Sequence, residues 1–335
     1  MRLMRILVLL MIMAVLVGCK GPLPEVGMRD CNASQGMWDH PQAAELATEA
    51  AQAAGGGALL ASRFASLEAL KGVVQIDYFS RTGEPVPAGV EASAARVVHC
   101  SNGQKVTGIL AAGISQGGMS KAQGGGLWGQ AGLILDSPYA VVNRADLQNV
   151  MRLARRRQNF FGEGDAAYLD FAEDMVAHIN TADLAFLSAS DTSEKGYLNT
   201  FNHVTAQAFI TSFYSEELAD FVGDVHERHN MPELVTGIFS DSQLVDPIQN
   251  PVDNYVDIVN NEWGQELGKQ LKEKYHIERD TWWTAELLAN YLNDIQAYFT
   301  WVLQIGFKPF KPEDEVVFRF TQKINYVMRM RGMEG

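Results

Sequence analysis

The sequence predicts a mainly α-helical protein, in which a helical bundle follows a smaller, glycine-rich part that contains β-strands. With 47% hydrophobic and 20% charged residues over 335 positions, the chain has the composition of a folded globular protein. After about Asn143 the hydrophobic residues recur at helical spacing almost without interruption. Before that point, ten of the 30 glycines fall between Gly103 and Gly132, beside short runs of β-branched residues.

Residues 1–18 predict a secretory signal peptide. Arg2 and Arg5 precede an apolar run over residues 6–18, which is too short to cross a bilayer as a helix. The run ends in Leu16-Val17-Gly18-Cys19, which resembles the lipobox of bacterial lipoproteins. This resemblance implies cleavage before Cys19 and acylation of its thiol, so that the mature chain would contact the membrane through a lipid anchor.

The predicted anchor places the protein in the cell envelope. Lys20 stands where an Asp would favour the inner membrane, so the sorting pattern of lipoproteins implies the outer membrane, facing the periplasm. Residues 19–40 contain proline and glycine without an apolar period, which is typical of a tether. The net charge of −13 argues against a general affinity for nucleic acid. No signature in the sequence identifies a substrate or a protein partner in the envelope.

Two more cysteines, Cys31 and Cys100, remain after the predicted lipidation site. In an oxidising compartment they could form a disulfide that ties the tether to the folded part. Two unpaired thiols are the alternative, because the sequence does not give the distance between them.

Residues 41–142 form the predicted glycine-rich α+β part. Its alanine- and leucine-rich segments predict a pair of short helices, and its β-branched runs predict the strands of a small sheet. Asn102-Gly103 is a typical hairpin turn between the last two strands. We expect the helices at Ala43–Ala54 and Ala58–Leu70, and the strands at Val73–Phe79, Ala95–His99 and Val106–Ile114.

Residues 143–335 form the predicted helical domain. Apolar residues at helical spacing predict helices at Asp146–Phe161, Asp165–Ile179, Leu198–Tyr214, Glu216–His229, Val252–Lys274 and Thr284–Ile305. The last segment, Val316–Met330, is also assigned to a helix. Aromatic residues of this domain are expected to fill its core, among them Trp263, Trp282, Trp283 and Trp301.

The first candidate site is the segment Gly113–Gly118, which has the G-x-S-x-G form of a nucleophile elbow after a strand-like run. In that reading Ser115 is the nucleophile of a serine esterase, and Leu133–Leu135 is the next buried strand. The context is unfavourable, because the fold that carries this motif needs further parallel strands, whereas the rest of the chain predicts helices. The alternative is a glycine-rich loop or hairpin that packs closely against the bundle.

The second candidate site is a set of polar residues on three predicted helices. Asn199 and His203 lie four residues apart and share one helix face. Asp224-Val225-His226-Glu227 follows on the next helix, and Asp257 and Asn261 lie on the helix after that, beside Gly264 and Gly268. Polar residues next to glycines indicate a close helix crossing with hydrogen-bonding groups pointing into it.

The order of these motifs, N-x-x-x-H, D-x-H-E and D-x-x-N-N-x-x-G, resembles an uncharacterised family of helical domains found in bacterial secreted, phage-associated and toxin-like proteins. The resemblance covers Leu198–Gly268, about a fifth of the chain. Asn202 and Gln265 stand where arginines are common in that pattern, so any anion-binding role of those arginines is in doubt here. The resemblance implies a helical fold and a site, without a reaction.

Several kinds of chemistry fit this cluster. His203, His226 and Asp257 form a sufficient ligand set for a divalent metal such as zinc, which would activate water. Without a metal, a histidine beside Asp257 or Glu227 could act as a general base, with Asn261 in the same site. The alternatives are a ligand pocket and a structural network that fixes the packing of the helices. The sequence thus predicts an anchored lipoprotein that is a hydrolase or a non-catalytic scaffold or binding protein.

Overall fold

The computed structural model describes residues 57–101, 103–124, 132–134, 136–186, 188–247 and 250–330. The signal peptide, the lipidation site Cys19, the tether, Cys31 and the predicted helix Ala43–Ala54 lie outside this range and stay predictions. Within it the protein is mainly α-helical with one small sheet, which confirms the predicted fold class. No helix in the described ranges is long and apolar enough to span a membrane.

The sheet has four antiparallel strands in the order β2-β1-β3-β4. The strands are β1 (Val74–Ser80), β2 (Pro85–Val86), β3 (Ala92–Ser101) and β4 (Gln104–Ala111), so the three predicted strands are confirmed with shifted ends. Ser101 pairs with Gln104 across the β3–β4 turn, where Gly103 has a φ of 75°. A glycine adopts this conformation without a steric penalty, which allows the tight turn.

The single helix predicted over Ala58–Leu70 is wrong. The segment contains only a short 3-10 helix, η2 (Ala61–Arg63), and the start of α3 (Leu67–Lys71). The reason is a long-range contact: the Leu59 N–H donates to Asn260 Oδ1 at 2.8 Å, and the Leu59 carbonyl accepts from Asn260 Nδ2 at 2.9 Å. These bonds satisfy the backbone of Leu59 without a helix.

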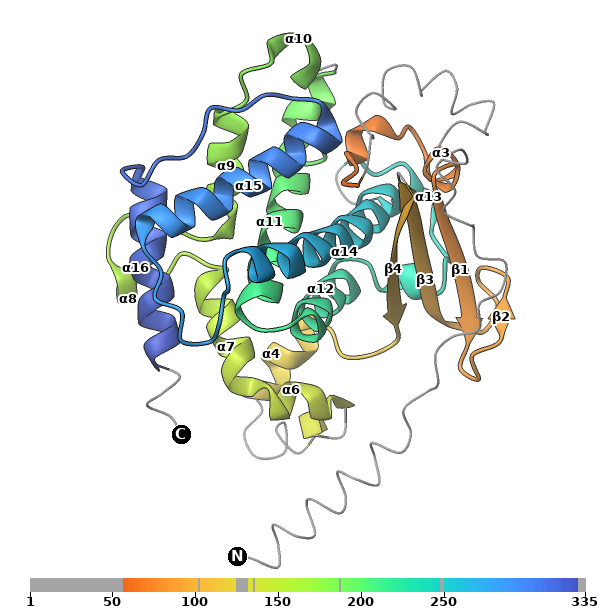
Figure 1. The fold of residues 1–335 in the computed structure, drawn as a ribbon. Coiled ribbons are helices and arrows are strands. Elements are labelled where there is room, and N and C mark those ends of the chain that lie inside the picture. The colour runs from red at the N-terminus through yellow and green to blue at the C-terminus, as the bar shows by residue number, and fades with distance from the viewer. Residues whose placement is uncertain are drawn as a thin grey trace, which may run out of the picture.

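Helices account for most of the remaining structure (Figure 1). The long ones are α11 (Tyr197–Phe213), α12 (Glu216–Asn230), α14 (Pro251–Lys274), α15 (Ala285–Leu303) and α16 (Glu315–Met330), which confirms those predicted helices. Shorter ones are α4 (Gln116–Gly124), α6 (Pro138–Val142), α7 (Arg144–Leu153), α8 (Gln158–Phe161), α9 (Tyr168–Ala177), α10 (Ala182–Ala185), η3 (Ala189–Thr192), η4 (Pro232–Val235) and α13 (Asp241–Leu244).

The helix predicted over Asp146–Phe161 is divided between α7 and α8, and a buried ion pair explains the break. Lys323 Nζ lies 2.9 Å from Asp165 Oδ2 and also donates to the backbone carbonyl of Arg155 at 2.9 Å. Asp165 in turn accepts from the Arg157 N–H at 2.5 Å. The backbone between the two helices is therefore hydrogen-bonded to a buried charged pair that lies far away in the sequence.

Helix α14 lies at the centre of the molecule, between the sheet and the other helices (Figure 1). It contributes Leu267 and Leu271 to the main helical core, and Val256 and Trp263 to a second cluster that includes apolar residues of the sheet. The division of the chain at residue 143 stays a prediction. Of the tryptophans expected in the core, Trp263 and Trp283 are buried, whereas Trp282 and Trp301 are 55% and 46% exposed, so this prediction is wrong for the latter two.

Helices α11 and α14 cross at very short range, as the glycines predicted. A Cβ on Gly264 would lie 2.6 Å from the carbonyl oxygen of Val204, and one on Gly268 would lie 2.6 Å from that of Ala208. On α12, a Cβ on Gly223 would lie 3.1 Å from the amide nitrogens of Asn261 and Gln207. The absence of side chains at these positions lets the three helices bring their polar residues together.

Candidate functional site

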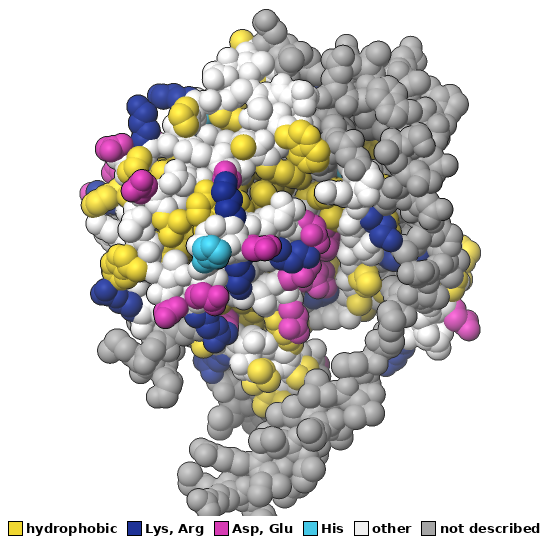
Figure 2. Space-filling model, viewed as in Figure 1, with side chains coloured by type: hydrophobic (Ala, Val, Ile, Leu, Met, Phe, Trp, Pro, Cys, Tyr) yellow, Lys and Arg dark blue, Asp and Glu magenta, His cyan; other side chains and the backbone are white. Residues whose placement is uncertain are grey.

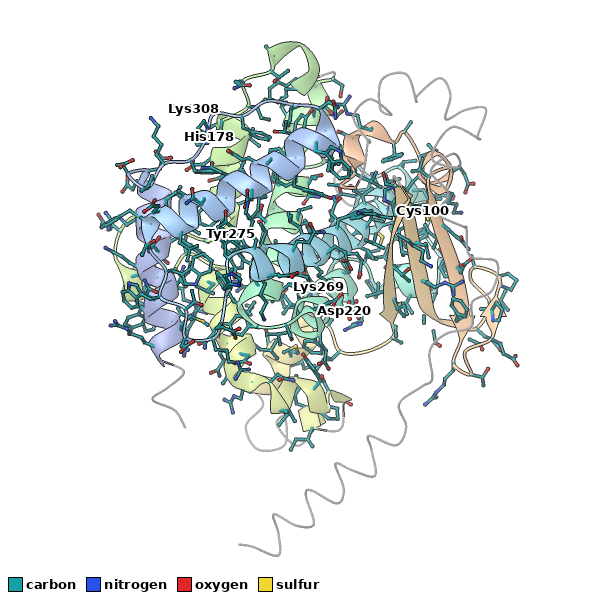
Figure 3. The ribbon with its side chains drawn as sticks, in the orientation of Figure 1. Cys100, His178, Asp220, Lys269, Tyr275 and Lys308 are labelled. Carbon is teal, nitrogen blue, oxygen red and sulfur yellow. The ribbon has the colours of Figure 1, made fainter. Side chains whose placement is uncertain are left out.

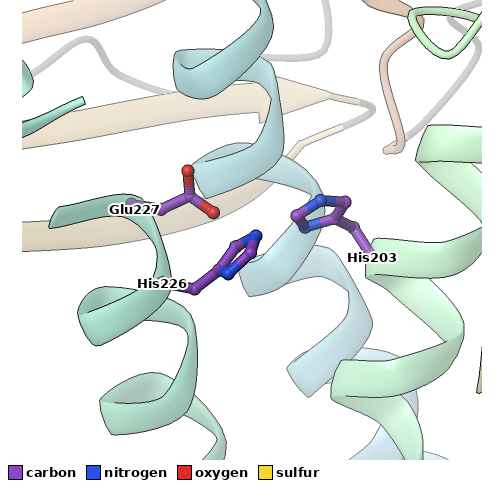
Figure 4. A group of neighbouring side chains, drawn as sticks. All are labelled: His203, His226 and Glu227. Atoms are coloured by element: carbon purple, nitrogen blue, oxygen red, sulfur yellow. The ribbon is translucent and has the colours of Figure 1, made fainter. Parts of the chain in front are cut away.

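Three helices bring the predicted polar residues together in the interior (Figure 4). His203 comes from α11, His226 and Glu227 from α12, and Asp257 and Asn261 from α14. One ligand atom each from His203, His226 and Glu227 lie within 4.8 Å of one another. We refer to these three residues as the His–His–Glu cluster.

His203 is held in one orientation by its neighbours. Its Nδ1 lies 2.9 Å from Asn261 Oδ1, and its Nε2 lies 3.5 Å from Asp257 Oδ2. Burial lowers the pKa of His203, so the ring is neutral at pH 7. Because the Asn261 oxygen only accepts hydrogen bonds, Nδ1 carries the proton, and the lone pair lies on Nε2, beside Asp257.

Glu227 is the least satisfied member of the His–His–Glu cluster. It is 1% exposed; its Oε1 accepts a long hydrogen bond of 3.5 Å from Asn261 Nδ2, while its Oε2 has no hydrogen-bond partner among the described residues. Burial, together with the nearby carboxylates Asp257 and Asp224, raises the pKa of Glu227 well above its ordinary value. A buried oxygen without a partner costs about 1–3 kcal/mol, so this position favours a proton or a cation.

His226 is the more accessible histidine, at the outer edge of the site. Its Nδ1 lies 3.4 Å from Gln116 Oε1 and its Nε2 lies 3.1 Å from Asn230 Nδ2. Burial, followed by the neighbouring His203 and His229, lowers the pKa of His226 to about 4. The neutral ring accepts from the Asn230 amide through Nε2, a weak partner that a metal ion can displace.

Asp257 lies beside His203 and belongs to a group of carboxyl and amide side chains at the site. Its Oδ1 accepts from Asn199 Nδ2 at 2.8 Å, and the same amide reaches Asp253 Oδ1 at 3.5 Å. Burial raises the pKa of Asp257, and burial together with Asp257 raises the pKa of Asp253 to about 7. Both carboxyl groups can therefore exchange a proton near neutral pH.

Of the three predicted metal ligands, His203 and His226 lie together with Glu227, while Asp257 lies 3.5 Å from His203 Nε2; the metal itself stays a prediction. Analysis of the sequence missed Gln116, Asn230 and Asp253. Asp253 lies one helical turn before Asp257, and Asn230 lies one turn after His226, so the spacing of four residues was an available signal for both. Gln116 comes from the separate helix α4 and has no such signal.

Ser115 does follow a strand and precede a helix, but its hydroxyl has a structural role. Ser115 Oγ accepts from the Gly118 N–H at 3.2 Å at the start of α4. In the described part of the chain, no hydrogen bond joins this oxygen to a histidine or a carboxylate, and the preceding strand belongs to an antiparallel sheet. The predicted strand Leu133–Leu135 is also wrong, because its described residues, 133 and 134, are helical.

Helix α12 also holds the loop that carries Ser115. Arg228 donates from Nε to the carbonyl of Ile114 at 2.9 Å, and from Nη1 to that of Ala111 at 3.0 Å. A Cβ on Gly117 would lie 3.1 Å from His229 Nδ1. These contacts agree with the predicted close packing of the glycine-rich loop, and they place Gln116 beside His226.

Cys100, near the end of β3, is disulfide-bonded (Figure 3). The predicted partner, Cys31, lies outside the described residues, so the pairing of these two cysteines stays a prediction.

Comparison of the chain with models of known families, with characterised proteins and with solved structures finds no match.

Proposed function

We propose that this protein is a lipoprotein of the cell envelope, anchored through Cys19 to the outer membrane, whose helical domain binds a divalent metal such as zinc and hydrolyses its substrate there. The observation that carries the proposal is the buried Oε2 of Glu227, which has no hydrogen-bond partner among the described residues and lies beside two neutral histidines. Two imidazoles and one carboxylate are a known ligand set of catalytic zinc sites, which leave one position open for water.

The two histidines are suited to metal binding in the resting state. Both His203 and His226 are neutral at pH 7, so neither must lose a proton before it binds. Asn261 bonds both His203 and Glu227 and thereby fixes the direction of two ligands. Such partners of metal ligands set the ring tautomer and contribute to affinity.

Asp257 supplies the acid–base group in this proposal. A bound metal would lower the pKa of a water molecule and polarise the bond to be broken. Asp257 lies 3.5 Å from His203 Nε2, and Asn199 holds its other oxygen at 2.8 Å. Its raised pKa lets it accept a proton from the attacking water and return it to the leaving group.

A structural network is the second candidate, because the bonds from Asn261 already join α14 to α11 and to α12. It predicts a folded protein that binds no metal, and a loss of stability when His203 or Asn261 is replaced. Metal content and turnover distinguish the two.

The test is the metal content of the purified full chain by mass spectrometry, followed by a screen for metal-dependent hydrolysis of chromogenic esters and phosphoesters. We expect close to one divalent ion per chain, lost in His203→Ala and Glu227→Gln, and turnover that follows metal content. His276→Asn is the matched control, since His276 is exposed and has a positive φ of 50°, which Asn tolerates. Absence of metal in folded wild-type protein would overturn the proposal.

A further inference from the structure

A second site lies on another face of α14, away from the His–His–Glu cluster. Helices α14 and α15 and the start of β4 enclose an open cleft of about 690 Å³. A volume of this size is typical of sites for small ligands. Figure 2 shows apolar side chains on this face with acidic and basic side chains beside them.

The cleft is built from two helix faces. On α15, Asp294, Tyr298 and Trp301 are spaced by four and three residues and so line one wall. On α14, the lining residues run from Trp263 to Lys274, a rise of about 16 Å along the helix axis. The cleft is therefore an elongated groove that can hold a short linear molecule.

Trp301 presents an aromatic surface at this groove. It is 46% exposed, the most accessible of the large apolar side chains of α15. Its ring centroid lies 6.3 Å from that of Tyr298, whose hydroxyl accepts from the Ala58 N–H at 3.1 Å. The tyrosine is thus fixed in position, and the two rings form one aromatic wall.

Charged groups of both signs surround the aromatic wall. Lys274 Nζ lies 2.5 Å from Asp294 Oδ2, which also accepts from the Tyr275 hydroxyl at 2.6 Å. Lys105 and Glu266 line the groove as well, so its two basic residues are balanced by two acidic ones. This balance does not favour a strongly charged ligand, whereas the amide and charged groups can bond to hydroxyls.

We propose that this groove binds a neutral oligosaccharide. The C–H faces of sugar rings pack against aromatic rings, whose faces carry partial negative charge, and the hydroxyls bond to polar side chains around them. An extended peptide is a poorer fit, because the long walls are helices whose backbone groups are already paired, and the edge strand β4 contributes only its first two residues, Gln104 and Lys105.

The test is calorimetric titration of the full chain with the N-acetylglucosamine tetramer, in a detergent without a sugar headgroup, because a glycoside detergent would compete. We expect binding to the wild type, and an affinity at least ten-fold weaker in Trp301→Ala. Trp282→Ala is the matched control: Trp282 is 55% exposed, packs under Arg329 at 4.4 Å and does not line the groove, so its variant should bind as the wild type does.

Absence of binding to the tetramer, or equal affinities of wild type and Trp301→Ala, would overturn the proposal. So would Trp301-dependent binding of an uncharged N-acetylated tetrapeptide at the same or higher affinity, which would identify a peptide groove. Metal content is measured on the same samples and should not change in Trp301→Ala. The two proposals can therefore fail independently.

Discussion

Replacement of Glu227 by Gln should stabilise the folded protein when no metal is present and destabilise it when metal is bound. The two side chains have nearly the same shape, but Gln has no charge and no basic oxygen for a metal. In wild-type protein without metal, Glu227 Oε2 is buried and no residue in the described part of the chain bonds to it, which costs about 1–3 kcal/mol. Gln cannot ionise, so at a pH above the folded pKa of Glu227 the variant avoids a buried carboxylate, and we expect it to be more stable than the metal-free wild type by about this amount.

With metal bound, the wild type should be more stable than Glu227→Gln. A ligand at a thousand times its Kd stabilises the folded state by about 4 kcal/mol, and the variant loses this gain if Glu227 is a ligand. The assay is urea unfolding of both proteins with excess chelator and with excess zinc. A metal-free variant that is less stable than the wild type would refute the reasoning, because it would show that Glu227 has a favourable partner inside the folded protein.

The pH dependence of the stability of metal-free protein gives a further check on the effect of Glu227. The pKa of Glu227 is raised in the folded state, so the folded protein binds more protons than the unfolded chain at intermediate pH. The stability that this extra proton gives the folded state is fully present below the unfolded pKa of about 4.3 and is lost as the pH rises toward the folded pKa. We therefore expect metal-free wild type to lose stability with rising pH more steeply than Glu227→Gln.

Three other perturbations test the helix crossing, the titration of Asp253 and the buried ion pair of Lys323. Gly264→Ala should destabilise the protein by about 1–3 kcal/mol in urea unfolding, since its Cβ would lie 2.6 Å from the Val204 carbonyl oxygen; an unchanged midpoint would contradict the close crossing. Asp253→Asn should flatten the fall in metal-free stability between about pH 4 and 7, because burial raises the pKa of Asp253 to about 7 and the folded state holds its proton longer; an identical pH profile would contradict this assignment. Lys323→Met should cost about 3–5 kcal/mol by leaving Asp165 buried without its cation, and a loss below 1 kcal/mol would show that the pair is dispensable.

The sequence predicts the cluster well where neighbours lie on one helix. Asn199 and His203, or Asp257 and Asn261, are four residues apart, so a helical period is enough to place each pair on one face. The glycines at 264 and 268 point to the close crossing that joins these faces. The fold class follows from the same periodicity, together with the β-branched runs of the sheet.

The features that the sequence did not predict depend on contacts between segments that are distant along the chain. The helix predicted at residues 58–70 is replaced because Asn260 bonds the backbone of Leu59. Gln116 reaches His226 only because Arg228 holds the preceding loop. Trp301 is an aromatic residue in a helix with many apolar residues, and its type and spacing do not tell that it is 46% exposed. No local pattern encodes these arrangements.

The central claim is that the His–His–Glu cluster binds a metal ion. The most direct test is an anomalous difference map from crystals grown with zinc, with data collected on both sides of the zinc absorption edge. We predict one strong peak with ligand distances of about 2.0–2.2 Å to a nitrogen of His203, a nitrogen of His226 and an oxygen of Glu227. A map without a peak there, with Asn230 still bonded to His226 and Glu227 Oε2 facing only water or protein, would contradict the account.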